Sequence, residues 1–253
     1  MIRKLSSTQS LLASSLSAAT KDIRWLAALF PRHESFVELT GGDHPLLFAK
    51  DRSKVEVLND RDGLVVKLCR ILRDPASAKQ LAEVVRGTVA GQHIPDDFLQ
   101  AAKFFHGGRA SLRASRTQSW KFGEQFHLCF DGTTEIFEPL ARRLCGTQIE
   151  KLAWQDALHR YDQPRAFFSI NLDSWSGCAT DRLPFSESVA YRNDLFGHLA
   201  SIQGSACVYS RVLGEMDLPN GWNLHRRQMD AINESTPLLA WTNYQVSARG
   251  GAR

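Results

Sequence analysis

The chain has 253 residues, of which 43% are hydrophobic and 23% charged, and its formal net charge is +4. This length and composition fit a globular protein with one large domain or two small ones, and exclude a fibrous or wholly disordered chain. The mild positive charge permits a polyanionic partner without requiring one. The sequence contains five cysteines and no CxxC pair, so it predicts no zinc or redox site, and we expect reduced thiols in a cytoplasm.

The first 20 residues are rich in Ser, Ala and Thr, a composition that favours disorder at a chain end. They begin with a cationic stretch, but Ser and Thr interrupt every apolar run, so no signal-peptide core forms. No segment reaches the ~18 consecutive apolar residues that a membrane-spanning helix needs. We therefore expect a soluble, intracellular protein.

Helical and strand patterns alternate from residue 21 onward. Apolar residues at helical spacing predict helices, and short apolar runs bounded by turn residues predict buried strands. In the first part of the chain we expect a helix over 21–30, a strand over 36–39, a helix over 45–49, a strand over 55–58 and a helix over 63–72. In the second part we expect a helix over 154–161, a strand over 166–172, a helix over 193–202 and strands over 206–209 and 238–244.

This alternation predicts an α/β fold with a Rossmann-like, mainly parallel sheet flanked by helices. Residues 76–147 interrupt it, because their first third is helical in pattern and the rest is rich in Gly, Arg and Ser. We interpret residues 21–75 and 148–253 as the α/β domain. Residues 76–147 are then an inserted, mainly helical and basic region outside the sheet.

The most informative pattern lies in residues 36–62, where FVELTGG is followed by KVEVLND and RD. A strand, a glycine-containing turn, a helix and a second strand with acidic residues at its end together hold an adenosine-containing cofactor in doubly wound domains. A carboxylate can accept both hydrogen bonds of a ribose diol, and glycines let the backbone approach a ligand closely. The alternative is that these are ordinary strand-end and turn residues. The candidate cofactor residues are Glu38, Gly41, Gly42, Asp60 and Asp62.

In order and spacing, these segments resemble the D12-class (Dam-like) adenine-N6 DNA methyltransferases. FVELTGG resembles the family's FVEPFGG-type motif, and KVEVLNDRD resembles the strand whose terminal acidic residues hold the adenosine of S-adenosylmethionine. GLVVKLCRILRDP, GTQIEKLAWQDALHRYDQPRAFF and the closing Gly221-Trp222 and LLAWTNY resemble later segments. The resemblance covers about residues 25–244. It implies a methyltransferase sheet, S-adenosylmethionine as cofactor, and double-stranded DNA as substrate in a restriction-modification setting.

The family's catalytic motif is Asp-Pro-Pro-Tyr at the end of a buried strand. Its Asp or Asn and a backbone carbonyl accept the protons of the adenine amine, and its Tyr stacks on the flipped-out base. The corresponding residues here are Asn171-Leu172-Asp173-Ser174, without the prolines or the tyrosine. Asn171 is the candidate acceptor, with Asp173 as the acid if the alignment is shifted. Trp175 is the candidate stacking aromatic, and its alternative is packing on the next helix.

The family also has a Trp-x-Gly-Gly-Lys element that contacts the amino-acid end of S-adenosylmethionine. The corresponding stretch here is SLSAATKDI, which retains Lys21 and lacks both glycines. In FVELTGG, Leu39-Thr40 replaces the family's Pro-Phe pair, and Asp43-His44 follows the glycines. Asp43 and His44 form either a new acid/base pair or a polar surface turn, and the local sequence favours the turn.

Residues 98–123 contain no acidic residue, and three aromatics are interleaved with their five Lys and Arg residues. Cations bind phosphates, and small flexible residues suit groove contacts. The segment also lies where the family has its target-recognition region. The alternative is a solvated basic face with Phe104 and Phe105 in the core. The predicted DNA-binding residues are Lys103, Arg109, Arg113, Arg116 and Lys121.

Three functional hypotheses follow. The first is a DNA methyltransferase with a divergent catalytic motif, and the second is a pseudo-methyltransferase that binds DNA or partners an active subunit. The third is a remodelled enzyme that uses another ligand through Asp43, His44 and Asp173. The missing prolines, tyrosine and glycines favour weak or lost activity, whereas the retained Glu38 and Asp60 favour a surviving ligand pocket.

Overall fold

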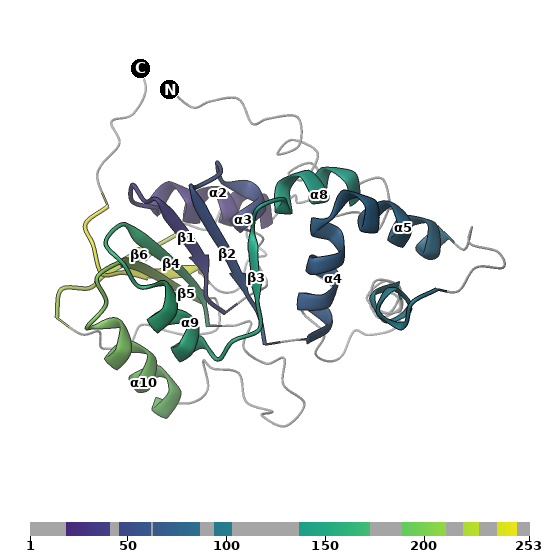
Figure 1. Cartoon of the computed structure of the whole chain (residues 1–253). Coiled ribbons are helices and arrows are strands. Elements are labelled where there is room, and N and C mark those ends of the chain that lie inside the picture. The colour runs from purple at the N-terminus through teal and green to yellow at the C-terminus, as the bar shows by residue number, and fades with distance from the viewer. Residues whose placement is uncertain are drawn as a thin grey trace, which may run out of the picture.

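The computed structural model describes residues 19–40, 46–61, 63–86, 94–102, 137–172, 189–210, 220–227 and 237–246. In these ranges seven strands form one sheet, and helices lie against it (Figure 1). The predicted α/β class with a mainly parallel sheet flanked by helices is therefore confirmed. Among the described helices, none is long and apolar enough to cross a bilayer.

The strands are β1 (Ser35–Glu38), β2 (Val55–Asn59), β3 (Gln148–Glu150), β4 (Ala166–Asn171), β5 (Ser205–Ser210), β6 (Asn223–Arg226) and β7 (Leu239–Thr242). They follow the order β3-β2-β1-β4-β5-β7-β6. The first five pair in parallel, and β7 pairs antiparallel with both β5 and β6. The strand order reverses between β1 and β4, so the topological switch point lies between these two strands.

The helices are α2 (Ala19–Leu29), α3 (Leu46–Ala49), α4 (Gly63–Arg73), α5 (Pro75–Arg86), α8 (Phe137–Leu144), α9 (Trp154–Tyr161) and α10 (Val189–Leu199). They cover both faces of the sheet. Side chains alternate between the two faces along a strand, and successive residues of the central strands are buried, so both faces need a covering layer. Phe36 and Phe167 pack with α2, α3, α4, α5 and α8 in one core cluster. Val37 and Phe168 pack with α9 and α10 in the other.

Most predicted elements are present, with bounds shifted by a few residues. The helix predicted over 154–161 has the bounds of α9. The helix predicted over 193–202 starts earlier, at Val189, and ends at Leu199. The Leu199 side chain is buried, and the chain turns directly after it. The C-terminal bound was therefore predicted too far along the chain.

The sequence does not predict β3 and β6. Each contains a single aliphatic residue, Ile149 and Leu224 respectively. One apolar residue produces no alternation, so neither segment carries a strand pattern of its own. Both become strands because a neighbouring strand with a buried apolar pattern, β2 or β7, offers them a row of backbone hydrogen bonds.

The regular elements in the described parts of residues 76–147 are all helical, and they add no strand to the sheet. They are α5 from residue 76 onward, residues 96–102, and α8. Leu81, Ala101 and Leu140 are buried in the same cluster as α4, so these helices share the core of the α/β unit. That residues 76–147 form a separate inserted region stays a prediction. Residues 87–93 and 103–136 lie outside the described part of the chain.

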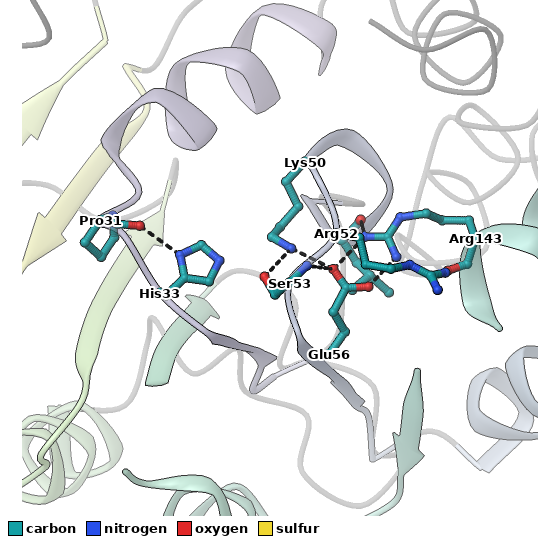
Figure 2. Close-up of polar contacts among 8 residues, drawn as sticks. Pro31, His33, Lys50, Arg52, Ser53, Glu56 and Arg143 are labelled. Atoms are coloured by element: carbon teal, nitrogen blue, oxygen red, sulfur yellow. Dashed lines mark hydrogen bonds and ion pairs between the residues drawn. The ribbon is translucent and has the colours of Figure 1, made fainter. Parts of the chain in front are cut away.

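A buried ionic cluster joins α8 to β2 near the amino ends of the strands (Figure 2). Glu56 Oε1 accepts hydrogen bonds from Lys50 Nζ at 2.7 Å, Arg143 Nη2 at 2.9 Å and the Ser53 N–H at 3.1 Å. Glu56 Oε2 pairs with the same guanidinium, which also donates to the Leu47 carbonyl. The side chains of Lys50, Glu56 and Arg143 are 6%, 3% and 11% exposed. This cluster therefore fixes α3, β2 and α8 to one another.

Candidate functional site

The structure brings three of the predicted site residues to one edge of the sheet. Glu38 is the last residue of β1, Asp60 directly follows β2, and Asn171 is the last residue of β4. Because β1 pairs in parallel with both β2 and β4, the carboxyl ends of the three strands meet there. This is also where the strand order reverses, which is the usual place for a ligand in an open α/β sheet.

Lys21 lies in the first turn of α2. A contact of the next residue, Asp22, shows where this turn lies on the sheet. The Asp22 and Arg227 side chains, 4% and 7% exposed, form an ion pair. Arg227 directly follows β6, which runs parallel to β5 because both are antiparallel to β7. The start of α2 therefore lies over the carboxyl edge of the sheet, on the side of β6.

Several predicted site residues lie outside the described residues, so their predicted roles stay predictions. Those near the sheet edge are Gly41, Gly42, Asp43, His44, Asp62, Asp173 and Trp175. The predicted DNA contacts are Lys103, Arg109, Arg113, Arg116 and Lys121.

Glu38 is a buried acid in a polar part of the core. It is 3% exposed, and it pairs across the ladder with Ser169 of β4, which is also buried. Within the described residues, neither Glu38 Oε1 nor Ser169 Oγ has a hydrogen-bond partner. Burial and, to a smaller extent, the charge of Asp60 raise the pKa of Glu38 to about 8. At neutral pH its side chain is therefore mainly the uncharged acid, which can both donate and accept a hydrogen bond.

Asp60 lies beside Glu38, between the end of β2 and α4. Its backbone N–H donates to the Glu150 carbonyl at 3.2 Å. Its charge raises the pKa of Glu38 and also that of the buried Cys69 thiol in α4, for which burial is the larger cause. Two carboxyl groups of different exposure thus adjoin at the switch point: Glu38 is buried and Asp60 is half-buried.

Asn59 holds this edge together, although no sequence motif marked it as a site residue. Its Nδ2 donates to the carbonyls of Leu39 at 2.9 Å and Leu152 at 3.2 Å, and its Oδ1 accepts from the Leu152 N–H at 2.9 Å. The segment after β3 is thereby fixed next to the end of β1. The available signal was an asparagine beside Asp60 at the end of a buried strand, which also fits an ordinary turn.

The Thr40 side chain links the segment after β1 to the last residue of β4. Its Oγ1 accepts from the Asn171 N–H at 2.9 Å and donates to the Asn171 carbonyl at 3.1 Å. A continued parallel ladder would join the Asn171 N–H to the Leu39 carbonyl, which instead accepts from the Asn59 side chain. The two strands therefore end their pairing here through side chains. Leu39 and Thr40 thus have a structural role in this chain.

Replacing Thr40 by valine should lower the free energy of unfolding by about 1–3 kcal/mol, because the Asn171 N–H loses its acceptor in a buried setting. Thr40→Ser retains the hydroxyl and is the matched control, for which we expect a smaller loss. Urea denaturation followed by tryptophan fluorescence measures both variants. Equal stability of Thr40→Val and the wild type would show that water or another group replaces the hydroxyl.

Asn171 itself is 1% exposed and pairs with Tyr209 of β5 in the ladder. The predicted acceptor of the adenine protons therefore lies below the surface of the described part of the chain. Among the described residues, no group of three His, Cys, Asp or Glu side chains could hold a metal ion.

Comparison of the sequence with family models and with curated proteins found no match.

Proposed function

We propose that this chain is a homologue of the Dam-like adenine-N6 DNA methyltransferases in which methyl transfer is weak or lost. The observation that carries the proposal is the meeting of Glu38 and Asp60 at the switch point, where the charge of one raises the pKa of the other. These are the two described acidic residues that the resemblance assigns to the cofactor. The strand order also supports it, since ligands of open α/β sheets bind where the strand order reverses, which here is beside Glu38.

The residues at the edge fit S-adenosylmethionine. Asp60, half-buried at the end of β2, is suited to accept the hydrogen bonds of the ribose diol. The buried Oε1 of Glu38 lacks a partner among the described residues, and a polar group of the ligand would satisfy it. Lys21, at the start of α2, is assigned to the amino-acid end. When bound, the cofactor supplies an electrophilic methyl group.

Two features favour weak or lost transfer. The Asn-Leu-Asp-Ser segment lacks the prolines that aim two acceptors at one nitrogen and the tyrosine that stacks on the base. The Asn171 side chain is buried, so an adenine amine reaches it only if the edge opens. These features also favour the second candidate, a pseudo-methyltransferase that binds DNA or a partner chain without transferring a methyl group.

The deciding experiment is titration calorimetry of the full chain with S-adenosylmethionine, with and without duplex DNA. We expect binding in the micromolar range. Asp60→Asn should weaken it by about tenfold or more, since a hydrogen bond to a charged group contributes about 1.5–3 kcal/mol. Asp156→Asn, on the exposed side of α9, is the matched control and should bind like the wild type.

An absence of binding in both conditions would overturn the methyltransferase proposal. If the cofactor binds, incorporation of labelled methyl groups into duplex DNA distinguishes the two candidates. Slow incorporation that Asn171→Ala abolishes supports a weak enzyme. No incorporation supports the pseudo-methyltransferase.

A further inference from the structure

An open hollow of about 610 Å³ lies between α4, α5, residues 96–102 and the segment after β3. Its position is beside the edge strand of the sheet, since α4 lies next to β3 (Figure 1). None of the residues that line it belongs to the cofactor site described above. They are Gly63, Leu64, Val66, Lys67, Arg70, Ile71, Ser77, Asp97 and Lys151.

The lining is cationic, because three basic residues face one carboxylate among the described residues. Lys67 Nζ binds Asp97 Oδ1 at 2.6 Å and Gln100 Oε1 at 2.8 Å. This pairing fixes residues 96–102 on α4 as one wall of the hollow. Two positive charges, those of Arg70 and Lys151, then remain without a paired carboxylate in the described part of the chain.

Both of these cations are exposed, and Arg70 is held in place. Arg70 donates from Nε and Nη2 to the Ile149 carbonyl, at 3.2 and 2.8 Å, which orients the guanidinium without neutralising its charge. The Lys151 ammonium lies over the first residue of α4, Gly63, where a Cβ would come within 2.9 Å of Nζ. Gly63 and Arg70 are seven residues apart on one helix, or about 10 Å.

The ligand that fits is an extended polyanion. A small anion is usually enclosed by its site. This hollow is instead open, and its two cations lie beside the first residue of α4 and in the last turn of α4. These positions are about 10 Å apart along the helix axis, a span that covers several phosphates of one nucleic-acid strand. The wall formed by residues 96–102 also leads directly into residues 103–121, whose five Lys and Arg residues have no acidic residue among them.

We propose that this hollow binds the sugar–phosphate backbone of DNA, with Arg70 and Lys151 as the phosphate contacts. The inference rests on the proposed function, in which DNA is the substrate or the bound partner. It adds a contact surface at the β3 edge of the sheet to the contacts predicted in residues 103–121. Because the contacts are to phosphates, they contribute affinity that does not depend on base sequence.

The test measures binding of fluorescein-labelled duplexes of unrelated sequence to the full chain by anisotropy, at 50–200 mM salt. For Lys151→Gln and for Arg70→Gln, the slope of log affinity against log salt should become shallower by about 0.9, and affinity at 0.1 M salt should fall roughly eightfold for every duplex. Lys54→Gln is the matched control and should change neither quantity. Like Lys151, Lys54 adjoins a strand. It directly precedes β2, so it lies at the amino ends of the parallel strands, and its side chain is 73% exposed.

The possible results separate this proposal from the proposed function. If the wild type binds DNA and both variants keep its affinity and slope, the hollow is not a contact and the proposed function stands. If the wild type binds no DNA, both proposals fail in their DNA-binding part. If Lys151→Gln weakens S-adenosylmethionine binding and leaves DNA affinity unchanged, the lysine belongs to the cofactor site and the proposal is overturned.

Lys151→Gln removes no hydrogen bond between described residues, so it tests the proposal even if Arg70→Gln destabilises the fold.

Discussion

Replacing Glu56 by alanine is expected to lower the free energy of unfolding by about 3–5 kcal/mol, because two buried cations lose their counter-charge. Lys50 and Arg143 both donate to this carboxylate, and their side chains are 6% and 11% exposed. Lys50 is also 4.5 Å from the centre of the Phe36 ring, so it has little room to reach water. Urea denaturation at pH 7, followed by circular dichroism, measures the loss.

Glu34 offers the matched control for this variant. It also contacts two cations, Lys54 at 3.0 Å and Arg165 at 2.5 Å, but its side chain is 39% exposed. Water can replace such contacts, so Glu34→Ala should change stability little. If the two alanine variants lose equal stability, burial of the Glu56 cluster is not the cause of its effect.

The Glu56 effect should also depend on pH. Burial acts to raise the pKa of Glu56, but the hydrogen bonds from Arg143 and Lys50 outweigh it and hold the pKa below its usual value of 4.5. The folded protein therefore gains stability from this carboxylate above pH 4.5 and loses the gain as pH falls through the lowered pKa. The difference between wild type and Glu56→Ala should accordingly shrink in acid.

Replacing Glu38 by glutamine is expected to stabilise the protein at pH 8. The folded-state pKa of Glu38 is about 8, above the usual 4.5. Between these values the folded chain keeps a proton that the unfolded chain has released, so wild-type stability falls by about 1.4 kcal/mol per pH unit. Glutamine has no titrating proton, so the stability of the variant has no such dependence on pH at this position. The stability advantage of Glu38→Gln should therefore grow from pH 5 to pH 8 and level off above it.

Denaturation curves at pH 5, 6, 7 and 8 for the wild type and Glu38→Gln measure this advantage, since other titrating groups cancel in the difference. Glu83→Gln, on the exposed side of α5, is the control and should show no such trend. A pH-independent difference for Glu38→Gln would mean that Glu38 is ionised in the folded protein at neutral pH.

The same Glu38→Gln variant should bind S-adenosylmethionine more weakly than the wild type. A residue that lowers stability and raises ligand affinity serves the ligand rather than the fold. Calorimetry at pH 7 measures this affinity. Unchanged affinity would remove Glu38 from the cofactor site and leave Asp60 as the described acidic residue of that site.

Local patterns predicted the elements that form the core of the sheet. The apolar runs of β1, β2, β4 and β5 and the helical spacing in α9 are visible without any partner segment, because periodicity and turn residues act over a few residues. The short strands β3 and β6 carry no such pattern and depend on the strands beside them. Part of the site follows in the same way: Glu38, Asp60 and Asn171 each lie at the end of a predicted buried strand.

By itself, the sequence determined the α/β class and the meeting of these three residues at one sheet edge, because the carboxyl ends of parallel strands come together. Only the tertiary structure decided the chemistry there. Thr40 bridges Asn171 from 131 residues away, and Arg143 reaches Glu56 from 87 residues away. The neutral state of Glu38 likewise results from burial by several packed elements. Desolvation and long-range contacts depend on the whole packed chain, so no local pattern encodes them.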